Sequence, residues 1–188
     1  MIILRLGFSS VLLCAAFAFS PCVIAQSGSG SIHIDDGARK MMKSQDATFA
    51  MKAAQGGMAE VRLGQLALEK STNPEVKSFG QKMVDDHSKA NKELKAAAEK
   101  DGMTLPKTMS AKDEALYQKL SQLSGSSFDK AYMKAMVKDH EEDVKQFQNE
   151  ANSGNNAGIK NFASTTLPTL QEHLQLAKST EQKVNVSA

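Results

Sequence analysis

The apolar residues of this chain recur at alternating steps of three and four from about residue 46 almost to the C-terminus. Within the segment 74–101 the repeating positions are Val76, Gly80, Met83, His87, Ala90, Leu94 and Ala97. Such spacing places these side chains along one side of an α-helix. No segment shows the sustained alternation of β-branched residues that is typical of strands. The sequence therefore predicts an all-α domain.

Capping residues divide this region into four long helices and one short helix. The long helices are predicted at about 47–71, 74–101, 127–152 and 157–181, and the short one at about 111–123. The expected caps are Asp46, Asn73 with Pro74, Ser110, Ser126 with Asp129, and Asn155-Asn156 at the beginnings, and Gly102 and Gly154 at two of the ends.

The connections predict the topology. The first two long helices are joined by two or three residues, as are the last two, so each pair is expected to form an antiparallel hairpin. About 24 residues separate the hairpins, and an extended loop with a short helix spans on the order of 40 Å. This connection is long enough to cross the domain and make 74–101 parallel to 127–152. Two hairpins with one crossover form a ferritin-like four-helix bundle, and a plain bundle with a fifth packed helix is the alternative.

The N-terminal residues predict export. Residues 1–25 contain Arg5, a short apolar run, and Val23 and Ala25 at the −3 and −1 positions of a signal peptidase site. Both cysteines of the chain lie in this segment, so the exported protein has no disulfide. We expect a flexible Gly/Ser arm at 26–45, the helical domain at 46–182 and a tail at 183–188.

The charge balance argues against nucleic acid as a partner. Of the 23 Lys and Arg residues only Arg5 lies in the signal, which leaves 22 basic against 21 acidic side chains, interspersed along the chain. There is no basic stripe and no Trp for base stacking. The exported chain has no run of about 18 apolar residues that would span a membrane. We expect a periplasmic protein, with association to the envelope or outer membrane and the oligomeric state left open.

A repeated motif carries histidines to the inner faces of the helices. Met-Val-Asp-Asp-His at 83–87 returns as Met-Val-Lys-Asp-His at 136–140, and Glu172-His173 follows near the C-terminus. His87, His140 and His173 each occupy an inward position near the middle of a different helix. Glu60 lies at the same depth of the first helix. One carboxylate and three imidazoles are therefore predicted to meet in one layer.

Such a layer suits a transition metal ion. Buried charges and imidazoles need partners, and nitrogen and oxygen donors bind Zn, Fe, Mn or Cu. Asp86, Asp139 and Glu172 would accept hydrogen bonds from the outer ring nitrogens. The alternative is a histidine layer without metal that specifies helix register. His33 lies in the predicted arm and has no assigned role.

Other features have simpler interpretations. Met51, Met58, Met83, Met133 and Met136 have the helical spacing of core residues, although methionine also suits copper. Pro168 is predicted to kink the last helix one turn before His173. Gly56 and Gly57 are expected to allow close helix packing. No hydrolase triad and no phosphate-binding loop can be identified, so the chain gives no positive indication of an enzyme.

Three stretches resemble a known family. They are "AAQGGMAEVRLGQLALEKSTNPEVKSFGQKMVDDHSKANKEL", "FDKAYMKAMVKDHEEDVKQF" and "IKNFASTTLPTLQEHLQLA". Together they are similar to the exported bacterial ferritin-like domain of unknown function 4142, whose members are often labelled predicted outer-membrane proteins. The resemblance covers about residues 46–180 and implies a helical ferritin-like fold and export, without an established reaction.

The resemblance does not extend to a di-iron site. Ferritin-like di-iron proteins use Glu-x-x-His on two helices, but Val84 precedes His87 and Leu170 precedes His173 by three positions. We therefore expect one metal ion at Glu60, His87, His140 and His173, for metal handling or envelope stress. A non-catalytic envelope interaction module is the alternative.

Overall fold

The computed structural model describes residues 36–186, with side chains from Gln45 onward. These residues form five helices and no strand. The helices are α1 (Asp36–Lys70), α2 (Pro74–Lys100), α3 (Ala111–Ser121), α4 (Gly125–Ser153) and α5 (Ala157–Val186). The predicted all-α class is confirmed. The predicted signal peptide, most of the predicted arm, and His33 lie outside the described residues.

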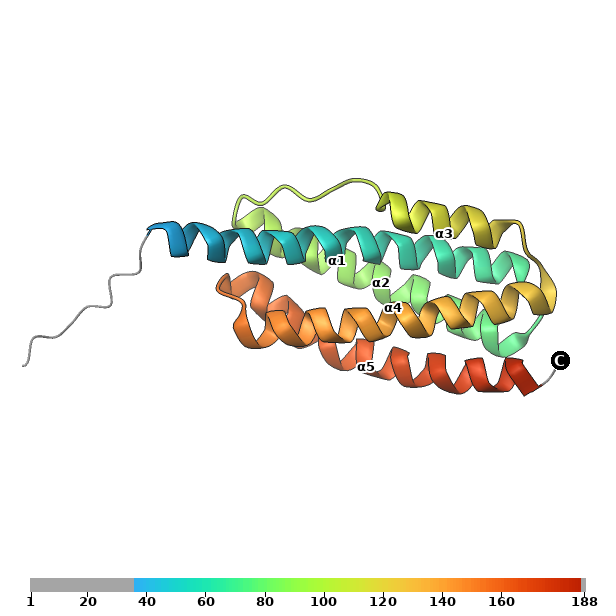
Figure 1. The fold of residues 1–188 in the computed structure, drawn as a ribbon. Helices are drawn as coiled ribbons and strands as arrows, with labels where there is room; N and C mark the ends of the chain where they lie inside the picture. Colours follow the sequence, from blue (N-terminus) through green and yellow to red (C-terminus); the bar gives the residue numbers. More distant parts are fainter. Residues whose placement is uncertain (1–35, 187–188) are drawn as a thin grey trace, which may run out of the picture. The chain divides into compact units, whose positions relative to one another are not determined.

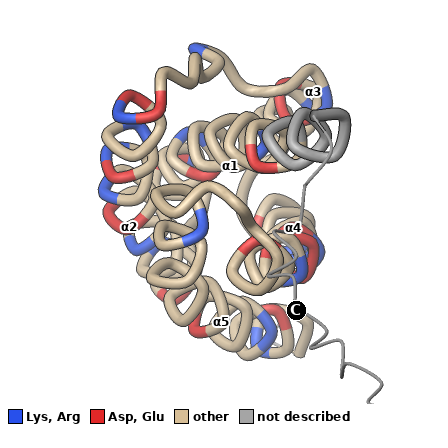
Figure 2. Tube along the Cα trace, turned by 90° about the vertical axis from the view of Figure 1, so that its left-hand side faces the viewer, with Lys and Arg blue, Asp and Glu red and all other residues tan. Residues whose placement is uncertain are grey.

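The four long helices pack as two hairpins. α1 lies along α2, and α4 lies along α5. α2 also packs against α5, and α1 against α4, so the order around the core is α1, α2, α5, α4 (Figures 1 and 2). The connection through α3 returns the chain to the end at which α2 began, and α2 and α4 therefore run in the same direction (Figure 1). The predicted crossover is present, and it places these two parallel helices diagonally.

The ends of α2 follow the predicted capping chemistry. The Asn73 side-chain carbonyl accepts hydrogen bonds from the backbone N–H groups of Glu75 and Val76, and Pro74 occupies the first helical position. Beyond the last turn, Gly102 has a φ of 65°, in the left-handed region that glycine adopts without strain. Local sequence is therefore sufficient to begin and end this helix.

The first helix begins earlier than the sequence indicates. α1 starts at Asp36, so residues 36–45 of the predicted arm are helical and Asp46 lies inside the helix. The prediction that Asp46 is an N-cap is wrong. Its buried carboxylate instead accepts hydrogen bonds from the backbone N–H groups of Asn155 and Asn156, at 3.0 and 2.8 Å. Asp46 thus stabilises the turn between α4 and α5, a role that depends on a contact distant in sequence.

Two other helix ends differ from the prediction. α4 begins at Gly125, with Ser124 as an N-cap that makes no side-chain hydrogen bond to the helix. The predicted Ser126–Asp129 cap is therefore wrong, and Asp129 is buried within the first turns. α5 continues to Val186 instead of ending near 181, because Thr180 and Val184 extend its buried face. The predicted tail at 183–188 is thus helical up to Val186.

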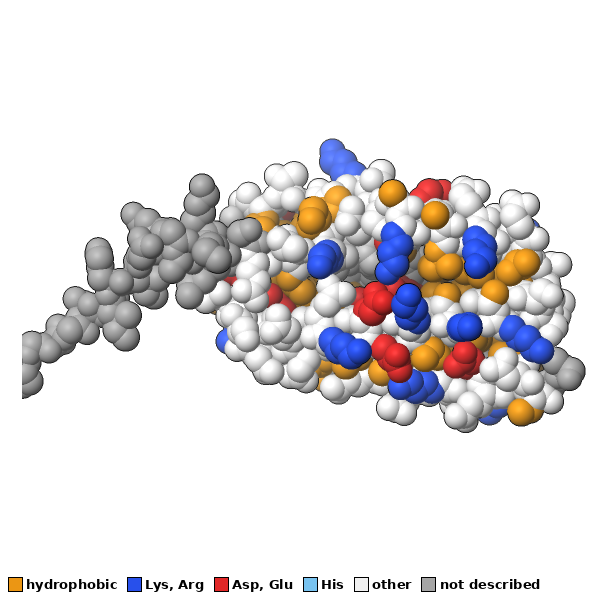
Figure 3. Space-filling view, in the orientation of Figure 1, with side chains coloured by type: hydrophobic (Ala, Val, Ile, Leu, Met, Phe, Trp, Pro, Cys, Tyr) orange, Lys and Arg blue, Asp and Glu red, His pale blue; other side chains and the backbone are white. Residues whose placement is uncertain are grey.

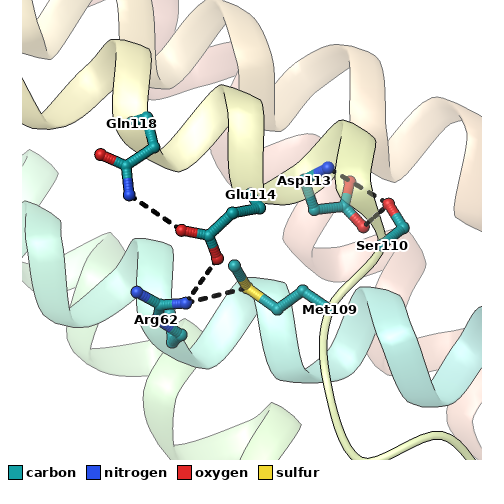
Figure 4. A network of polar contacts seen from close by, with 6 residues as sticks. All are labelled: Arg62, Met109, Ser110, Asp113, Glu114 and Gln118. Atoms are coloured by element: carbon teal, nitrogen blue, oxygen red, sulfur yellow. Dashed lines mark hydrogen bonds and ion pairs between the residues drawn. The ribbon is translucent and has the colours of Figure 1, made fainter.

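The crossover helix α3 is attached to α1 by polar contacts (Figure 4). Arg62 of α1 forms an ion pair of 2.8 Å with Glu114 and stacks over the Tyr117 ring, 4.1 Å from its centroid. At the N-terminus of α3, the Ser110 hydroxyl donates to the Asp113 carboxylate and accepts from the Asp113 backbone N–H. Ser110 is the predicted cap, and α3 covers the outer side of α1.

A polar layer divides the core into two apolar clusters. One cluster contains residues from the α1–α2 turn end, including Phe79, Met83 and Met136, and the other contains residues from the opposite end, including Leu94 and Phe147. On α2, α4 and α5 the residue between the two clusters is a histidine. The layer is therefore a consequence of placing one imidazole at the midpoint of each apolar stripe.

The outer surface carries mixed charge. Figure 2 shows basic and acidic residues distributed along all the helices, and Figure 3 shows them alternating with small apolar areas on one face. Among the described helices, none has the length and hydropathy that crossing a membrane requires.

Candidate metal centre

Three imidazole rings meet at the middle of the helical domain. His87 of α2, His140 of α4 and His173 of α5 are 6%, 0% and 1% exposed. Their ring centroids are 5.9 Å apart for His87–His140, 5.4 Å for His87–His173 and 5.5 Å for His140–His173. Each ring offers a nitrogen within 4.8 Å of the nitrogens offered by the other two. The predicted convergence of the three histidines is therefore present in the fold.

Hydrogen bonds orient two of the rings. Nδ1 of His140 lies 2.9 Å from the Met136 backbone carbonyl, which can only accept, so this nitrogen carries the proton. Nε2 of His173 lies 2.7 Å from an Asp86 carboxylate oxygen and donates to it. In each neutral ring the second nitrogen must then carry a lone pair. These lone pairs belong to Nε2 of His140 and Nδ1 of His173.

Three of the other ring nitrogens are buried without hydrogen bonds. Nε2 of His87, Nε2 of His140 and Nδ1 of His173 have no hydrogen-bond partner among residues 36–186. Leaving a buried polar atom unpaired costs about 1–3 kcal/mol. One such nitrogen on each of three touching rings is a costly arrangement for packing alone. The donor set fits a metal ion that prefers imidazole.

The surroundings keep the imidazoles neutral at physiological pH. Burial lowers the pKa of His87 well below its ordinary value, and the neighbouring imidazoles lower it further. Burial also lowers the pKa of His140 to about 4, despite the bond to Met136. Burial lowers the pKa of His173, although the hydrogen bond to Asp86 opposes this effect. Neutral imidazole is the form that binds metal ions.

Glu60 is placed differently from the prediction. It is fully buried, but it does not belong to the group of side chains whose ligand atoms lie within 4.8 Å of one another. Its carboxyl group instead faces Asp139 and Asp143 of α4. The helix is rotated so that Glu60 lies on the side towards α3 and α4. Helical periodicity alone does not determine that rotation.

Only one of the three predicted carboxylate acceptors contacts a ring. Asp86 accepts from His173 of a neighbouring helix, and not from His87 beside it in sequence. The outer nitrogen of His140 uses a backbone carbonyl, so Asp139 is free to face Glu60. Glu172 is exposed, with the Lys82 ammonium 3.9 Å away. The roles predicted for Asp139 and Glu172 are therefore not those that the structure shows.

Asp86 links the buried rings to a surface pocket. A pocket of about 590 Å³ lies between α2 and α5, and Asp86 forms part of its wall together with Thr166 and Thr169. The Lys82 ammonium also lies 3.1 Å from the Asp86 carboxylate. Partial burial raises the pKa of Asp86, but the bonds from His173 and Lys82 outweigh it and lower the pKa below its usual value. The carboxylate is therefore charged and positioned between solvent and the histidines.

The methionines, glycines and proline noted in the sequence have structural roles. Met83, Met133 and Met136 are fully buried in the apolar core, whereas Met51 is 44% exposed. A Cβ on Gly57 would clash with the Asn91 side-chain oxygen, which confirms close packing there, but a Cβ on Gly56 would meet no atom within 4 Å. Pro168 lies on the exposed side of α5.

A comparison with protein families assigns the chain. The model of the domain of unknown function DUF4142 matches residues 34–180. The chain belongs to the DUF4142 family. The match includes all three histidines of the layer and confirms the resemblance seen in the sequence. No curated protein matches this sequence at a significant level.

Two solved structures of another family have a similar fold. A DUF305 fragment from Deinococcus radiodurans has a TM-score of 0.65 and 15% identity, covering 74% of this chain and 96% of the fragment. A DUF305 protein from Streptomyces coelicolor, described as a candidate secreted protein, has a TM-score of 0.64 and 15% identity, with 75% and 92% covered. At this identity the likeness concerns the fold alone.

Proposed function

We propose that this DUF4142 protein is an exported ferritin-like four-helix bundle that binds one transition metal ion at His87, His140 and His173, and serves metal handling or envelope stress. The observation that carries the proposal is the set of three unpaired ring nitrogens, each buried, within one small layer. A single ion would satisfy all three at once. The hydrogen bonds to Met136 and Asp86 leave the lone pairs of two rings on nitrogens that make no hydrogen bond.

The three ring nitrogens would fit around a metal ion if they moved slightly closer together. Zinc–nitrogen bonds of about 2.0–2.1 Å place the nitrogens of a tetrahedral site about 3.4 Å apart. The nitrogens here lie within 4.8 Å of one another, so shifts of about 1 Å for each ring would be sufficient. Side-chain rotation accommodates movements of this size.

The ligand chemistry narrows the choice of metal. Three imidazoles favour Zn²⁺, Cu²⁺ or Fe²⁺ over Mn²⁺, which prefers oxygen ligands. Three protein ligands leave a fourth position open, where a bound ion would polarise water or another small ligand. The rings themselves are almost completely buried, which favours storage or transfer of the ion over chemistry on a large substrate.

Export and the ferritin-like class are parts of the same proposal. Residues 1–25 have the pattern of a signal peptide, and one DUF305 neighbour is described as a candidate secreted protein. The two hairpins joined by a crossover support the ferritin-like class. These observations support export, with the periplasm as the working hypothesis for the location and association with the outer membrane left open.

The competing function is an envelope interaction module in which the histidines only pack. The edge-on contacts between the rings favour it, since His140 meets both other rings at interplanar angles of 71–74°. This alternative must accept the cost of three unpaired nitrogens. In that case, replacing the histidines with apolar residues would stabilise the protein and change no other property.

Elemental mass spectrometry separates the two functions. The protein is exported by its own signal, purified without a histidine tag, and compared with the His140→Ala and Glu60→Gln variants. We expect about one equivalent of a single metal in the wild type and in Glu60→Gln, and none in His140→Ala. A wild type that stays metal-free after incubation with Zn²⁺, Cu²⁺ and Fe²⁺ would support the packing module instead.

A further inference from the structure

The histidine layer is almost closed to solvent. His87, His140 and His173 are 6%, 0% and 1% exposed, so an ion that binds them must first pass other side chains. The question of a route rests on the proposed function, because it arises only if an ion binds at the layer. The structure is therefore searched for a polar passage that ends at one of the three rings.

The pocket of about 590 Å³ between α2 and α5 extends to the layer along α2. Its wall on this helix follows Asp86, Ala90, Glu93 and Ala97, at steps of four, three and four. Residues at such steps lie on one side of a helix. The two alanines leave space between the helices, and Asp86 is the member of this row that is hydrogen-bonded to a histidine.

The opposite wall on α5 carries hydroxyl groups. Thr166 and Thr169 line the pocket and precede His173 by seven and four positions, which places all three on the same side of the helix. Hydroxyl and carboxylate oxygens interact favourably with a hydrated divalent cation. Both walls of the pocket therefore lead towards the residues that meet in the hydrogen bond between Asp86 and His173.

One oxygen of Asp86 is accessible and unengaged. The hydrogen bond from His173 and the contact with the Lys82 ammonium both use Oδ2, at 2.7 and 3.1 Å. Within residues 36–186 no hydrogen bond or ion pair reaches Oδ1, and this atom is not among the buried unpaired ones. A cation in the pocket can therefore meet Oδ1. The nearby ammonium disfavours a lasting stay there, which suits a transfer position better than a binding site.

We propose that a hydrated divalent transition metal ion enters the histidine layer through the pocket between α2 and α5, with Oδ1 of Asp86 as its last ligand before the imidazoles. The step breaks a metal–oxygen bond and forms metal–nitrogen bonds. It needs no proton transfer at His140 or His173, because the inner nitrogens of these rings already carry lone pairs. Imidazole suits Zn²⁺, Cu²⁺ and Fe²⁺ better than a carboxylate does, so the transfer runs towards the layer.

A second pocket provides the competing route. It has a volume of about 550 Å³ and lies between α1, α2 and the loop that precedes α3. Its wall includes the apolar side chains of Met58, Met103 and Leu105. In the part of the chain that the structure describes, no residue of this wall is hydrogen-bonded to a histidine of the layer. This pocket therefore lacks the link that Asp86 supplies on the other side of α2.

Glu93 and Glu99 form a matched pair for comparing the two routes. Both are exposed on α2, and each lies 4.0 or 3.7 Å from the lysine four residues before it. Glu93 lines the pocket between α2 and α5, whereas Glu99 lines the competing pocket. Replacing either one with lysine changes the net charge of the protein equally. A difference between the two variants therefore reports the path of the cation.

The measurement is the rate at which metal-free protein takes up Co²⁺. CoCl₂ is mixed with the protein in a stopped-flow instrument at low ionic strength, and the visible absorption of imidazole-bound Co²⁺ is followed. We expect the association rate constant of Glu93→Lys to be at least about threefold below that of the wild type, because the added positive charge repels the ion. Glu99→Lys should match the wild type, and the difference should diminish at high salt.

Asp86→Asn distinguishes an entry ligand from a residue that only orients His173. As the entry ligand, Asp86 must contribute to the association rate constant, so Asp86→Asn should bind Co²⁺ more slowly than Asp85→Asn. The inference is overturned if Asp86→Asn changes the dissociation rate constant alone, if Glu93→Lys and Glu99→Lys associate equally fast, or if only Glu99→Lys is slow. Absence of the Co²⁺ absorption in the wild type, or its persistence in His140→Ala, would instead overturn the proposed function, and the inference with it.

Discussion

The Nε2 atom of His173 donates a hydrogen bond of 2.7 Å to the carboxylate of Asp86, although 87 residues separate them in the sequence. The bond fixes the orientation and the tautomer of a fully buried ring from a residue at the edge of a surface pocket. Asp86 therefore contacts both solvent and the histidine layer.

Replacing Asp86 should weaken metal binding without removing a ligand. In Asp86→Asn the amide can still accept a hydrogen bond, but the negative charge that increases the basicity of His173 is lost. Changes to such outer partners typically reduce metal affinity by about 10–100-fold. Competition with a chelator measures the affinity, and Asp85→Asn is the matched control because Asp85 is exposed and contacts Gln81. Equal affinities of the two variants would contradict the role of Asp86.

Acid should destabilise the metal-free protein through the histidine layer. Burial lowers the pKa values of His87 and His173 and lowers that of His140 to about 4. Between about pH 6.5 and 4 these histidines therefore bind more protons in the unfolded chain than in the folded one. The contribution of these histidines to the free energy of unfolding must then fall as the pH is lowered through this range. For His140 alone the loss approaches about 3 kcal/mol.

The effect is best measured as a difference between two proteins. Buried carboxyl groups with raised pKa values, such as Glu60, change stability in the opposite direction. Urea unfolding of the metal-free wild type and of His140→Leu at pH 7 and pH 4.5 cancels most of that contribution. The wild type should lose more stability than the variant. Identical losses would show that His140 is already protonated at neutral pH, or is not buried.

Removing the Asp46 carboxylate should loosen the turn between α4 and α5. It accepts two backbone hydrogen bonds from this turn, and bonds to a charged acceptor contribute about 1.5–3 kcal/mol each. We expect Asp46→Ala to lower the free energy of unfolding by about 2–4 kcal/mol. Hydrogen exchange of the Asn155 and Asn156 amides should increase in parallel. Exchange unchanged at these amides would contradict the assignment.

Glycines of α1 should respond oppositely to alanine. A Cβ on Gly64 would lie 2.6 Å from the Gly80 carbonyl oxygen of α2, so Gly64→Ala must separate the two helices and should cost about 1–3 kcal/mol. Gly56→Ala adds its methyl group in open space and should stabilise the helix by about 0.5–1 kcal/mol. Thermal unfolding compares the two variants directly. A stabilised Gly64→Ala would show that the helices are not in contact there.

Local chemistry in the sequence determined much of the fold. The apolar repeat at steps of three and four predicted the helical class, and Asn73-Pro74, Ser110, Gly102 and Gly154 marked helix ends that the structure confirms. The lengths of the connections predicted the hairpins and the crossover. The repeated Met-Val-x-Asp-His motif predicted that the histidines would share a layer, because a helix midpoint keeps its depth whichever way the helix runs.

Tertiary packing decided what each helix turns towards its neighbours. The rotation of α1 directs Glu60 to α3 and α4 and away from the histidines, and the approach of α2 to α5 pairs Asp86 with His173 instead of the adjacent His87. Asp46, a good N-cap by local rules, became the partner of a turn more than a hundred residues away. Residue spacing specifies the side of a helix on which residues lie, but the partner of that side is chosen by the packing of the whole domain.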